Sequence, residues 1–140
     1  MIDKRKYDGL IISAATQDLL DNDPLRFKSL CNGVGSKVGS WFDRLLYHLT
    51  PNTIWFMDIT DGADLHDVDY SVPTLFHSIE AALQYRLDAD QRFLNNLEIR
   101  ITERGGLLKG LRLRRAKKYY YLLRGFGEES FMAGKRILEY

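Results

Sequence analysis

The sequence predicts an all-α fold in which two long antiparallel helices carry a His–Asp pair, with a glycine-rich loop and shorter helices around them. Two observations predict this fold. Apolar residues recur every three or four positions over long stretches, whereas the period-two alternation of half-buried strands is weak throughout. The chain has 140 residues, of which 45% are hydrophobic and 28% are charged. This size and composition predict one soluble globular domain over residues 1–140.

The first half of the chain predicts short helices separated by turns. Residues 10–20 are a short helical candidate within an N-terminal extension of residues 1–30, and the aspartates and proline of residues 21–24 predict a turn. Residues 31–40 contain three glycines, whose backbone can adopt positive φ angles, and they therefore predict a loop. Residues 41–49 predict a short amphipathic helix.

Three further helices are predicted in the second half. The first covers residues 58–70 or 60–70 and stops before Pro73, because the residue before a proline disfavours the helical conformation. The second covers residues 75–102 and ends at Gly105-Gly106, and the third covers residues 111–123. The inward stripe of the first helix is Ile59, Ala63, His66 and Tyr70, and that of the second is Ile79, Leu83, Leu87, Asp90, Leu94, Leu97 and Ile101.

Positive charge is concentrated near the C-terminus, although the whole chain has a net charge of only +1. From Arg100 to Tyr140, eleven Lys and Arg accompany four Glu, whereas the first 99 residues have nine basic and fifteen acidic residues. Residues 111–140 therefore form a basic C-terminal helix and tail. Basic residues interleaved with tyrosines are typical of contact with anionic lipid headgroups or nucleic-acid phosphates, but the charges can also simply be solvated. The candidate headgroup ligands are Arg112, Arg114, Arg115, Lys117 and Lys118.

Cysteine content and hydropathy exclude several classes of protein. Cys31 is the only cysteine, which excludes an intramolecular disulfide and a zinc site with several cysteine ligands. No stretch approaches the roughly 20 apolar residues that span a bilayer. The apolar run of residues 10–15 lacks a following cleavage site and is interpreted as part of a helix. Localisation stays open between the cytoplasm and export without a clear signal peptide.

Two polar residues, His66 and Asp90, interrupt the apolar stripes of the two central helices. Burying a lone carboxylate costs several kcal/mol, so Asp90 requires a partner, and His66 on an antiparallel helix is the obvious one. A carboxylate that holds one imidazole nitrogen fixes the tautomer and makes the other nitrogen a general base. The alternative is a buried structural pair without catalysis.

Asp67 follows His66 and points about 100° away around the helix, which suits a separate role such as binding a cation. Calcium takes six to eight oxygen ligands and commonly combines carboxylates with backbone carbonyls. A glycine-rich loop such as residues 32–39 can supply those carbonyls. The loop, the His-Asp dipeptide and the inward aspartate together form a more specific set than any one of them alone.

This set resembles the pattern of the phospholipase A2 superfamily, above all its small bacterial and phage-associated members. The resemblance rests on residues 32–37 (NGVGSK), 63–70 (ADLHDVDY) and 89–93 (ADQRF), and it covers about residues 30–125. The His-Asp-x-x-Tyr element of residues 66–70 is its most specific part, and the glycine loop is its least specific part.

The resemblance implies calcium-dependent hydrolysis of the sn-2 ester of glycerophospholipids. His66 would be the base that activates a water, Asp90 would orient His66, and Tyr70 would donate a hydrogen bond to Asp90. The phospholipid would be the substrate and Ca²⁺ the cofactor. Calcium would be bound by Asp67 and the carbonyl oxygens of Gly33, Gly35 and Lys37, with the N–H of Gly35 as a further oxyanion donor.

The chain departs from the family pattern at the two cysteines that normally bridge the calcium loop to the helix of the histidine. Val34 and Ala63 occupy those positions, so an apolar pair stands where the family has a disulfide. A glycine expected near Lys37 is also absent.

Three other functions are compatible with the sequence. The first is a non-catalytic, decayed member of the same fold that serves as a structural or interaction module. The second is a metal-dependent phosphohydrolase of the His-Asp type, and the third is a nucleic-acid-binding helical domain that uses the basic tail. The metal ligands of the phosphohydrolase would be His48, His66, Asp67 and either Asp88 or Asp90.

Overall fold

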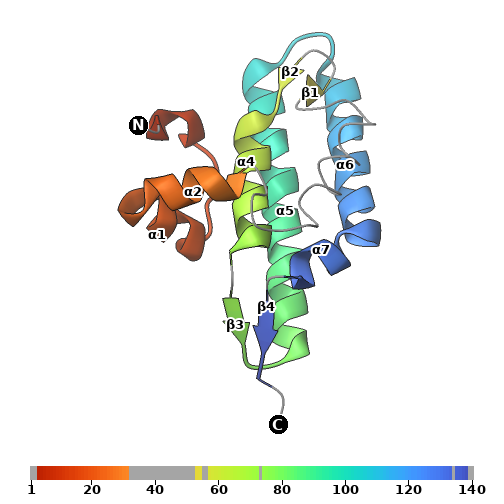
Figure 1. Cartoon of the computed structure of the whole chain (residues 1–140). Helices are drawn as coiled ribbons and strands as arrows, with labels where there is room; N and C mark the ends of the chain where they lie inside the picture. Colours follow the sequence, from red (N-terminus) through yellow and green to blue (C-terminus); the bar gives the residue numbers. More distant parts are fainter. Residues whose placement is uncertain (1–2, 32–52, 55–56, 73, 134, 139–140) are drawn as a thin grey trace.

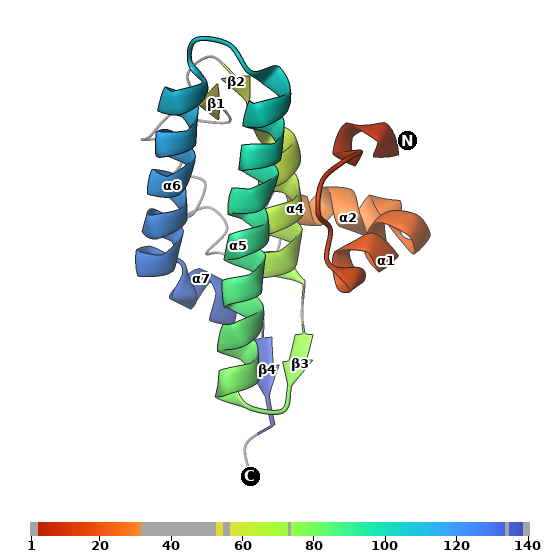
Figure 2. The same ribbon diagram turned by 180° about the vertical axis from the view of Figure 1, so that it is seen from behind.

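Three helices lie side by side and form the body of the protein: α4 (Thr60–Ser71), α5 (Ile79–Arg104) and α6 (Lys109–Phe126) (Figure 1). Each runs antiparallel to the next along the chain, and α5 lies between the other two (Figure 2). The computed structural model describes residues 3–31, 53–54, 57–72, 74–133 and 135–138. Most of these residues are helical, as the sequence predicts.

The N-terminal elements pack on α4, on the side of the molecule away from α6 (Figures 1 and 2). They are the 3-10 helix η1 (Lys4–Tyr7) and the helices α1 (Ala14–Asn22) and α2 (Pro24–Cys31). Helix α1 begins later than predicted, after Ser13, whose hydroxyl caps it by accepting a hydrogen bond from the Thr16 N–H.

Helix α2 is not predicted by the sequence analysis, which interprets residues 21–24 as a turn only. The turn exists, but it also starts a helix. The Asp23 carboxylate accepts a hydrogen bond from the Arg26 N–H at 3.3 Å, as an N-cap does. Pro24 is the first helical residue, where its missing N–H has no intrahelical partner to lose.

Two polar side chains of the helical body hold the N-terminal segment. Asn96 of α5, which is buried, accepts a hydrogen bond from the Ile11 N–H at 2.7 Å and donates one to the Ile11 carbonyl at 2.9 Å. Asp69 of α4 is also buried and accepts hydrogen bonds from the hydroxyls of Ser13 and Thr16, both at 2.6 Å. Residues 11–16 are therefore tied to both central helices, and the N-terminal extension is an integral part of the packing.

The boundaries of the central helices follow local capping residues. Helix α4 covers Thr60–Ser71, close to the predicted range. The predicted start of α5 at Leu75 is wrong, because the helix begins at Ile79 after the Ser78 hydroxyl caps it by accepting from the Ala81 N–H. Its end is as predicted: Gly105 and Gly106 have φ angles of 60° and 85°, which glycine adopts without strain.

Two short sheets complete the fold and were not predicted, because strands of two or three residues carry no measurable alternation. β1 (Thr53–Ile54) pairs antiparallel with β2 (Met57–Asp58). β3 (Thr74–Phe76) pairs parallel with β4 (Lys135–Ile137), which follows the short helix α7 (Glu128–Met132). The ammonium group of Lys135 donates hydrogen bonds to the carbonyls of Asp69, Tyr70 and Val72, at the C-terminal end of α4.

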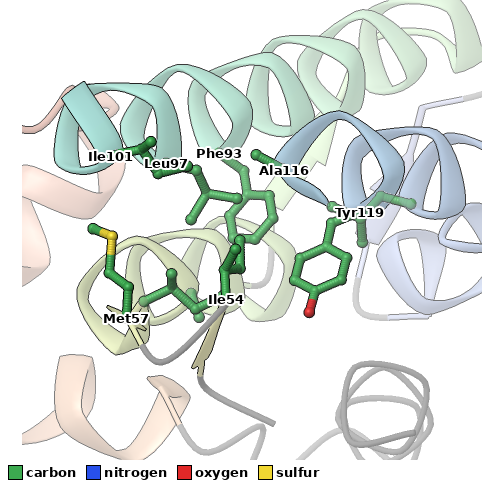
Figure 3. Packing of buried hydrophobic residues seen from close by; sticks show 10 residues of the cluster. Ile54, Met57, Phe93, Leu97, Ile101, Ala116 and Tyr119 are labelled. Carbon is green, nitrogen blue, oxygen red and sulfur yellow. The ribbon is translucent and has the colours of Figure 1, made fainter. Parts of the chain in front are cut away.

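The largest apolar cluster lies between α4, α5 and α6 and is closed by β1 and β2 (Figure 3). Phe93, Leu97 and Ile101 of α5 contribute one side of the cluster. Ala116, Tyr119 and Leu123 of α6 face them, as do Ile54, Met57, Ile59 and Ala63.

The predicted stripe of α5 is only partly correct. Asp90, Leu97 and Ile101 are buried as predicted, but Ile79 is 47% exposed and Leu83, Leu87 and Leu94 are half-buried. The buried face instead includes residues that apolar periodicity would not select, among them Arg86 and Asn96. All four inward residues predicted for α4 are buried.

Candidate active site

His66 and Asp90 lie in contact at the centre of the α4–α5 interface. The His66 Nε2 atom is 2.8 Å from the Asp90 Oδ1 atom, and both side chains are 0% exposed. The imidazole also packs against two aromatic rings, with centroid distances of 4.2 Å to Tyr70 and 4.9 Å to Phe93. The hydrogen bond of the pair is therefore well shielded from water, and aromatic rings cover the imidazole.

Tyr70 lies one turn after His66 on the same face of α4 and reaches the same carboxylate. Its hydroxyl donates a hydrogen bond to Asp90 Oδ1 at 2.6 Å. Burial first, and then the negative charge of Asp90, raise the pKa of Tyr70, so the hydroxyl keeps its proton and stays a donor. The structure thus brings His66, Tyr70 and Asp90 together, the three residues that the sequence analysis singles out.

Two arginines complete the surroundings of Asp90, and the sequence analysis missed both. The guanidinium group of Arg124, near the end of α6, donates a hydrogen bond to Asp90 Oδ2 at 2.8 Å. Arg86 lies one turn before Asp90 on α5, with its Nε atom 3.9 Å from Asp90 Oδ2 and 3.3 Å from the Tyr70 hydroxyl oxygen. The four-residue spacing of Arg86 and Asp90 is the one sequence signal for this contact.

Arg86 also joins α5 to the end of α6. Its Nη2 atom donates hydrogen bonds to the carbonyls of Leu123 at 2.6 Å and Arg124 at 3.1 Å. These carbonyls belong to the last turn of α6, and the Leu123 carbonyl also accepts a hydrogen bond from the N–H of the C-cap residue Gly127 at 2.8 Å. A buried cation at a helix C-terminus is electrostatically favourable, which explains how Arg86 is accommodated at 3% exposure.

Gly127 closes this corner of the site. A Cβ atom there would lie 2.7 Å from the Leu123 carbonyl oxygen, 3.0 Å from the Tyr70 hydroxyl oxygen and 3.4 Å from Arg86 Nη2. A side chain at this position would therefore displace groups that contact Asp90. The sequence analysis gave Gly127 no role, and its position beyond the basic helix carries no signal for one.

The surrounding groups keep Asp90 ionised. Burial by itself raises the pKa of this carboxyl group, but the hydrogen bond and charge of His66, together with the hydrogen bonds from Tyr70 and Arg124, outweigh burial, so the net effect is a lowered pKa. An ionised carboxylate can only accept hydrogen bonds, so the neutral imidazole carries its hydrogen on Nε2. Nδ1 then holds the lone pair and is the nitrogen that can take up a proton.

Asp67 follows His66 on α4 and is half-buried. Burial first, and then the carboxylates of Asp64 and Asp67, raise the pKa of the Cys31 thiol to about 12. The charge of Asp67 therefore acts on Cys31, the last residue of α2. The segment predicted to supply calcium ligands follows Cys31 in the sequence and lies outside the described residues.

The other predicted calcium ligands, Gly33, Gly35 and Lys37, lie outside the described residues, as does His48 of the alternative metal site. Within the part of the chain that the structure describes, no group of three or more His, Cys, Asp or Glu side chains is arranged to hold a metal ion. Of the predicted calcium ligands, Asp67 is the one that the structure describes.

The alternative metal ligand Asp88 lies apart from the pair. Its carboxylate accepts a hydrogen bond from Gln84, one turn earlier on α5, at 3.0 Å. Both oxygens of Asp90 already accept hydrogen bonds from protein side chains. Of the proposed phosphohydrolase ligands that the structure describes, His66 and Asp90 are in direct contact, whereas Asp88 contacts Gln84.

The basic residues of α6 fall into two groups. Arg112 was predicted to bind headgroups at the surface, and this is wrong, because it is buried at 4% exposure. Arg115 is half-buried, whereas Arg114, Lys117 and Lys118 are exposed. Leu111, on the same helix, is 40% exposed.

Comparisons with protein-family models, with curated proteins and with solved structures find no match to this chain. Within the described parts of the chain, no helix is long and apolar enough to cross a membrane.

Proposed function

We propose that the protein is a calcium-dependent hydrolase of the sn-2 ester of glycerophospholipids, with a water activated by His66. The observation that carries the proposal is the buried arrangement in which His66 Nε2 and the Tyr70 hydroxyl share one oxygen of Asp90, at 2.8 and 2.6 Å. The sequence resemblance described above assigns these three residues to a base, its orienting carboxylate and a supporting tyrosine.

In the proposed reaction His66 acts as the general base. Nδ1 takes a proton from a water molecule as the water oxygen attacks the ester carbonyl carbon, and a tetrahedral intermediate forms. The C–O bond to the glycerol oxygen then breaks, and His66 returns the proton to that oxygen, which leaves a lysophospholipid and a fatty acid. Asp90 holds the Nε2–H tautomer throughout and stabilises the imidazolium that forms.

Calcium belongs to the proposal through Asp67. The ion would be held by Asp67 and by the carbonyl oxygens of Gly33, Gly35 and Lys37, and when bound it supplies stabilisation of negative charge on the carbonyl oxygen. The support for Asp67 is its place on α4, directly after His66, and the action of its charge on Cys31, where the glycine-rich segment starts.

A second candidate function, a non-catalytic module of the same fold, is favoured by the burial of the pair. A base must reach its substrate, whereas the His66 side chain is 0% exposed. In addition, Arg124 and Arg86 compensate the charge of Asp90, as a purely structural network would require. The two candidates differ in one respect that can be measured, namely turnover.

The experiment that separates them is release of fatty acid from mixed phospholipid vesicles, with calcium and with EGTA. The proposal expects calcium-dependent release by the wild type, with the acyl chain coming from the sn-2 position of lipids labelled at one chain. His66→Gln should lower the rate by about 10²–10⁴-fold, the usual contribution of a general base.

His77→Gln is the matched control, since His77 is an exposed histidine in the turn before α5. It should leave the rate within about twofold of the wild type, as expected for a surface change. No release from folded wild-type protein would favour the non-catalytic module, whereas release that survives His66→Gln would contradict the role of His66 as the base.

A further inference from the structure

We propose that one exposed face of α6 docks the protein on anionic phospholipid surfaces. This surface, called the α6 face below, combines exposed apolar and basic side chains. Helix α6 lies at the edge of the molecule opposite α1 and α2 (Figures 1 and 2), and the surface extends along it from the connection between α5 and α6. Its residues are Leu107, Leu111, Arg114, Lys117, Lys118 and Tyr121.

Helical spacing places these residues on one side of α6. Leu111, Arg114, Lys118 and Tyr121 follow one another at intervals of three, four and three residues, which keeps their side chains on one face. The opposite face packs into the core through buried residues of the same helix. These are Arg112, Ala116, Tyr119 and Leu123.

Large apolar side chains are exposed on the α6 face. Leu107 is 103% exposed and Tyr121 is 69% exposed, while Leu111 is 40% exposed. Leu107 follows the two glycines that end α5, so it projects from the tip of a tight connection. Single exposed leucines are common on protein surfaces, but here a leucine at a tip and a second leucine on the adjoining first turn of α6 form an apolar strip at one end of the face. Tyr121 lies at the other end of the face, beyond Arg114 and Lys118.

The strip is flanked by positive charge without compensating negative charge. Helix α6 contains no Asp or Glu over residues 109–126. Arg114, Lys117 and Lys118 are exposed, and among the described residues they take part in no ion pair. Their charges are therefore available to a negatively charged partner.

The mixture of side chains identifies the partner as a lipid surface. Lys and Arg side chains can place their charges at the headgroups while leucine enters the boundary of the acyl chains and tyrosine lies at the interface. A nucleic-acid backbone would use the basic residues equally well, but it offers nothing to Leu107 and Leu111. The apolar strip thus favours anionic phospholipid.

The test measures binding of the full chain to vesicles in EGTA, using diether lipids that contain no ester bond. Binding is then independent of hydrolysis, so its outcome does not depend on whether the protein is an enzyme. Vesicles of phosphatidylcholine alone are compared with vesicles that also contain phosphatidylglycerol, at low and high salt. The wild type should bind the anionic vesicles preferentially and lose affinity at high salt.

Two variants test the α6 face itself. The triple variant R114Q/K117Q/K118Q should weaken the partition coefficient for anionic vesicles by about 100-fold, since each basic residue near such a surface contributes roughly fivefold. L107S/L111S should weaken it by about tenfold or more, because it removes apolar area that the bilayer would cover.

The control R26Q/K28Q/R136Q removes the same number of charges from exposed residues away from α6. It should stay within about threefold of the wild type, since the charge of the whole molecule contributes only weakly at this distance. The proposal is overturned if the control loses as much affinity as the α6 triple variant. It is equally overturned if wild-type protein ignores phosphatidylglycerol, or if it binds short duplex DNA more tightly than the vesicles and L107S/L111S leaves its binding unchanged.

Discussion

Asp90→Asn is the substitution that most directly probes the network around the candidate site. Asp90 is 0% exposed and accepts hydrogen bonds from His66, Tyr70 and Arg124. The asparagine keeps the size of the side chain but removes the negative charge, and its amide group can accept on one side only. Arg86, at 3% exposure, then remains buried without a nearby anion.

The expected loss of stability follows from the burial of the partners. Removing one member of a buried ion pair costs about 3–5 kcal/mol. The Arg124 side chain is 29% exposed and can turn toward water, and Arg86 retains its two carbonyl partners, so about 2–4 kcal/mol is expected here. A domain of this size has about 5–15 kcal/mol of stability, so the variant should still fold.

Urea unfolding followed by circular dichroism measures this loss. With a slope of about 2 kcal/mol per molar urea, the midpoint should fall by about 1–2 M. Asp88→Asn, a carboxylate two residues away that contacts Gln84, is the control and should change stability by less than about 0.5 kcal/mol. A loss below about 0.5 kcal/mol for Asp90→Asn would refute the argument that Asp90 neutralises buried cations.

Three further predictions concern pH and packing. Because the pKa of Asp90 is lowered in the folded protein, the unfolded chain binds more protons in acid. The stability that Asp90 provides should therefore be lost as the pH falls below the ordinary pKa of 3.8. Unfolding curves measured across acid pH should show that the free energy of unfolding depends less on pH in Asp90→Asn than in the wild type. Asn96→Ala should lower the free energy of unfolding by about 1–3 kcal/mol and speed amide hydrogen exchange near Ile11. Unchanged exchange would contradict the conclusion that the two hydrogen bonds of Asn96 hold the backbone of Ile11. Gly127→Ala should lower both the free energy of unfolding, by about 1–3 kcal/mol, and the rate of phospholipid hydrolysis. Gly125→Ala is the control and should leave the rate unchanged, because its Cβ would meet nothing within 4 Å. Equal activity of the two variants would argue against a role for Gly127.

The sequence predicted those parts of the fold that depend on local signals. The bounds of α4 and the glycine end of α5 follow from Pro73, Gly105 and Gly106, each of which acts within one turn of the chain. The contact between His66 and Asp90 was predictable because each is a polar residue in an otherwise apolar stripe. Such a residue requires a partner, and few partners are within reach.

Long-range contacts account for what the sequence did not predict. β3 pairs with β4 across about 60 residues, and no pattern within Thr74–Phe76 indicates it. Arg86 is buried because it meets carbonyls at the end of α6, and Arg124 approaches Asp90 from what the sequence presents as a basic tail. A charged side chain is assigned to the surface by default, and only the tertiary structure shows which one is buried.

The network around Asp90 also bears on the choice between the two candidate functions. Arg124 and Arg86 stabilise the ionised carboxylate whether or not the pair is catalytic. The two functions therefore agree on stability and make opposite predictions for activity alone.

Release of sn-2 fatty acid from phospholipid vesicles is the measurement that tests the central claim most directly. It compares wild type and His66→Gln, both first shown to be folded by circular dichroism, in calcium and in EGTA. The proposed function predicts release by the wild type in calcium alone, and a rate about 10²–10⁴-fold lower for His66→Gln. Folded wild-type protein that releases no fatty acid in calcium would contradict it, and the His66–Asp90 pair would then be a structural element of the α4–α5 interface.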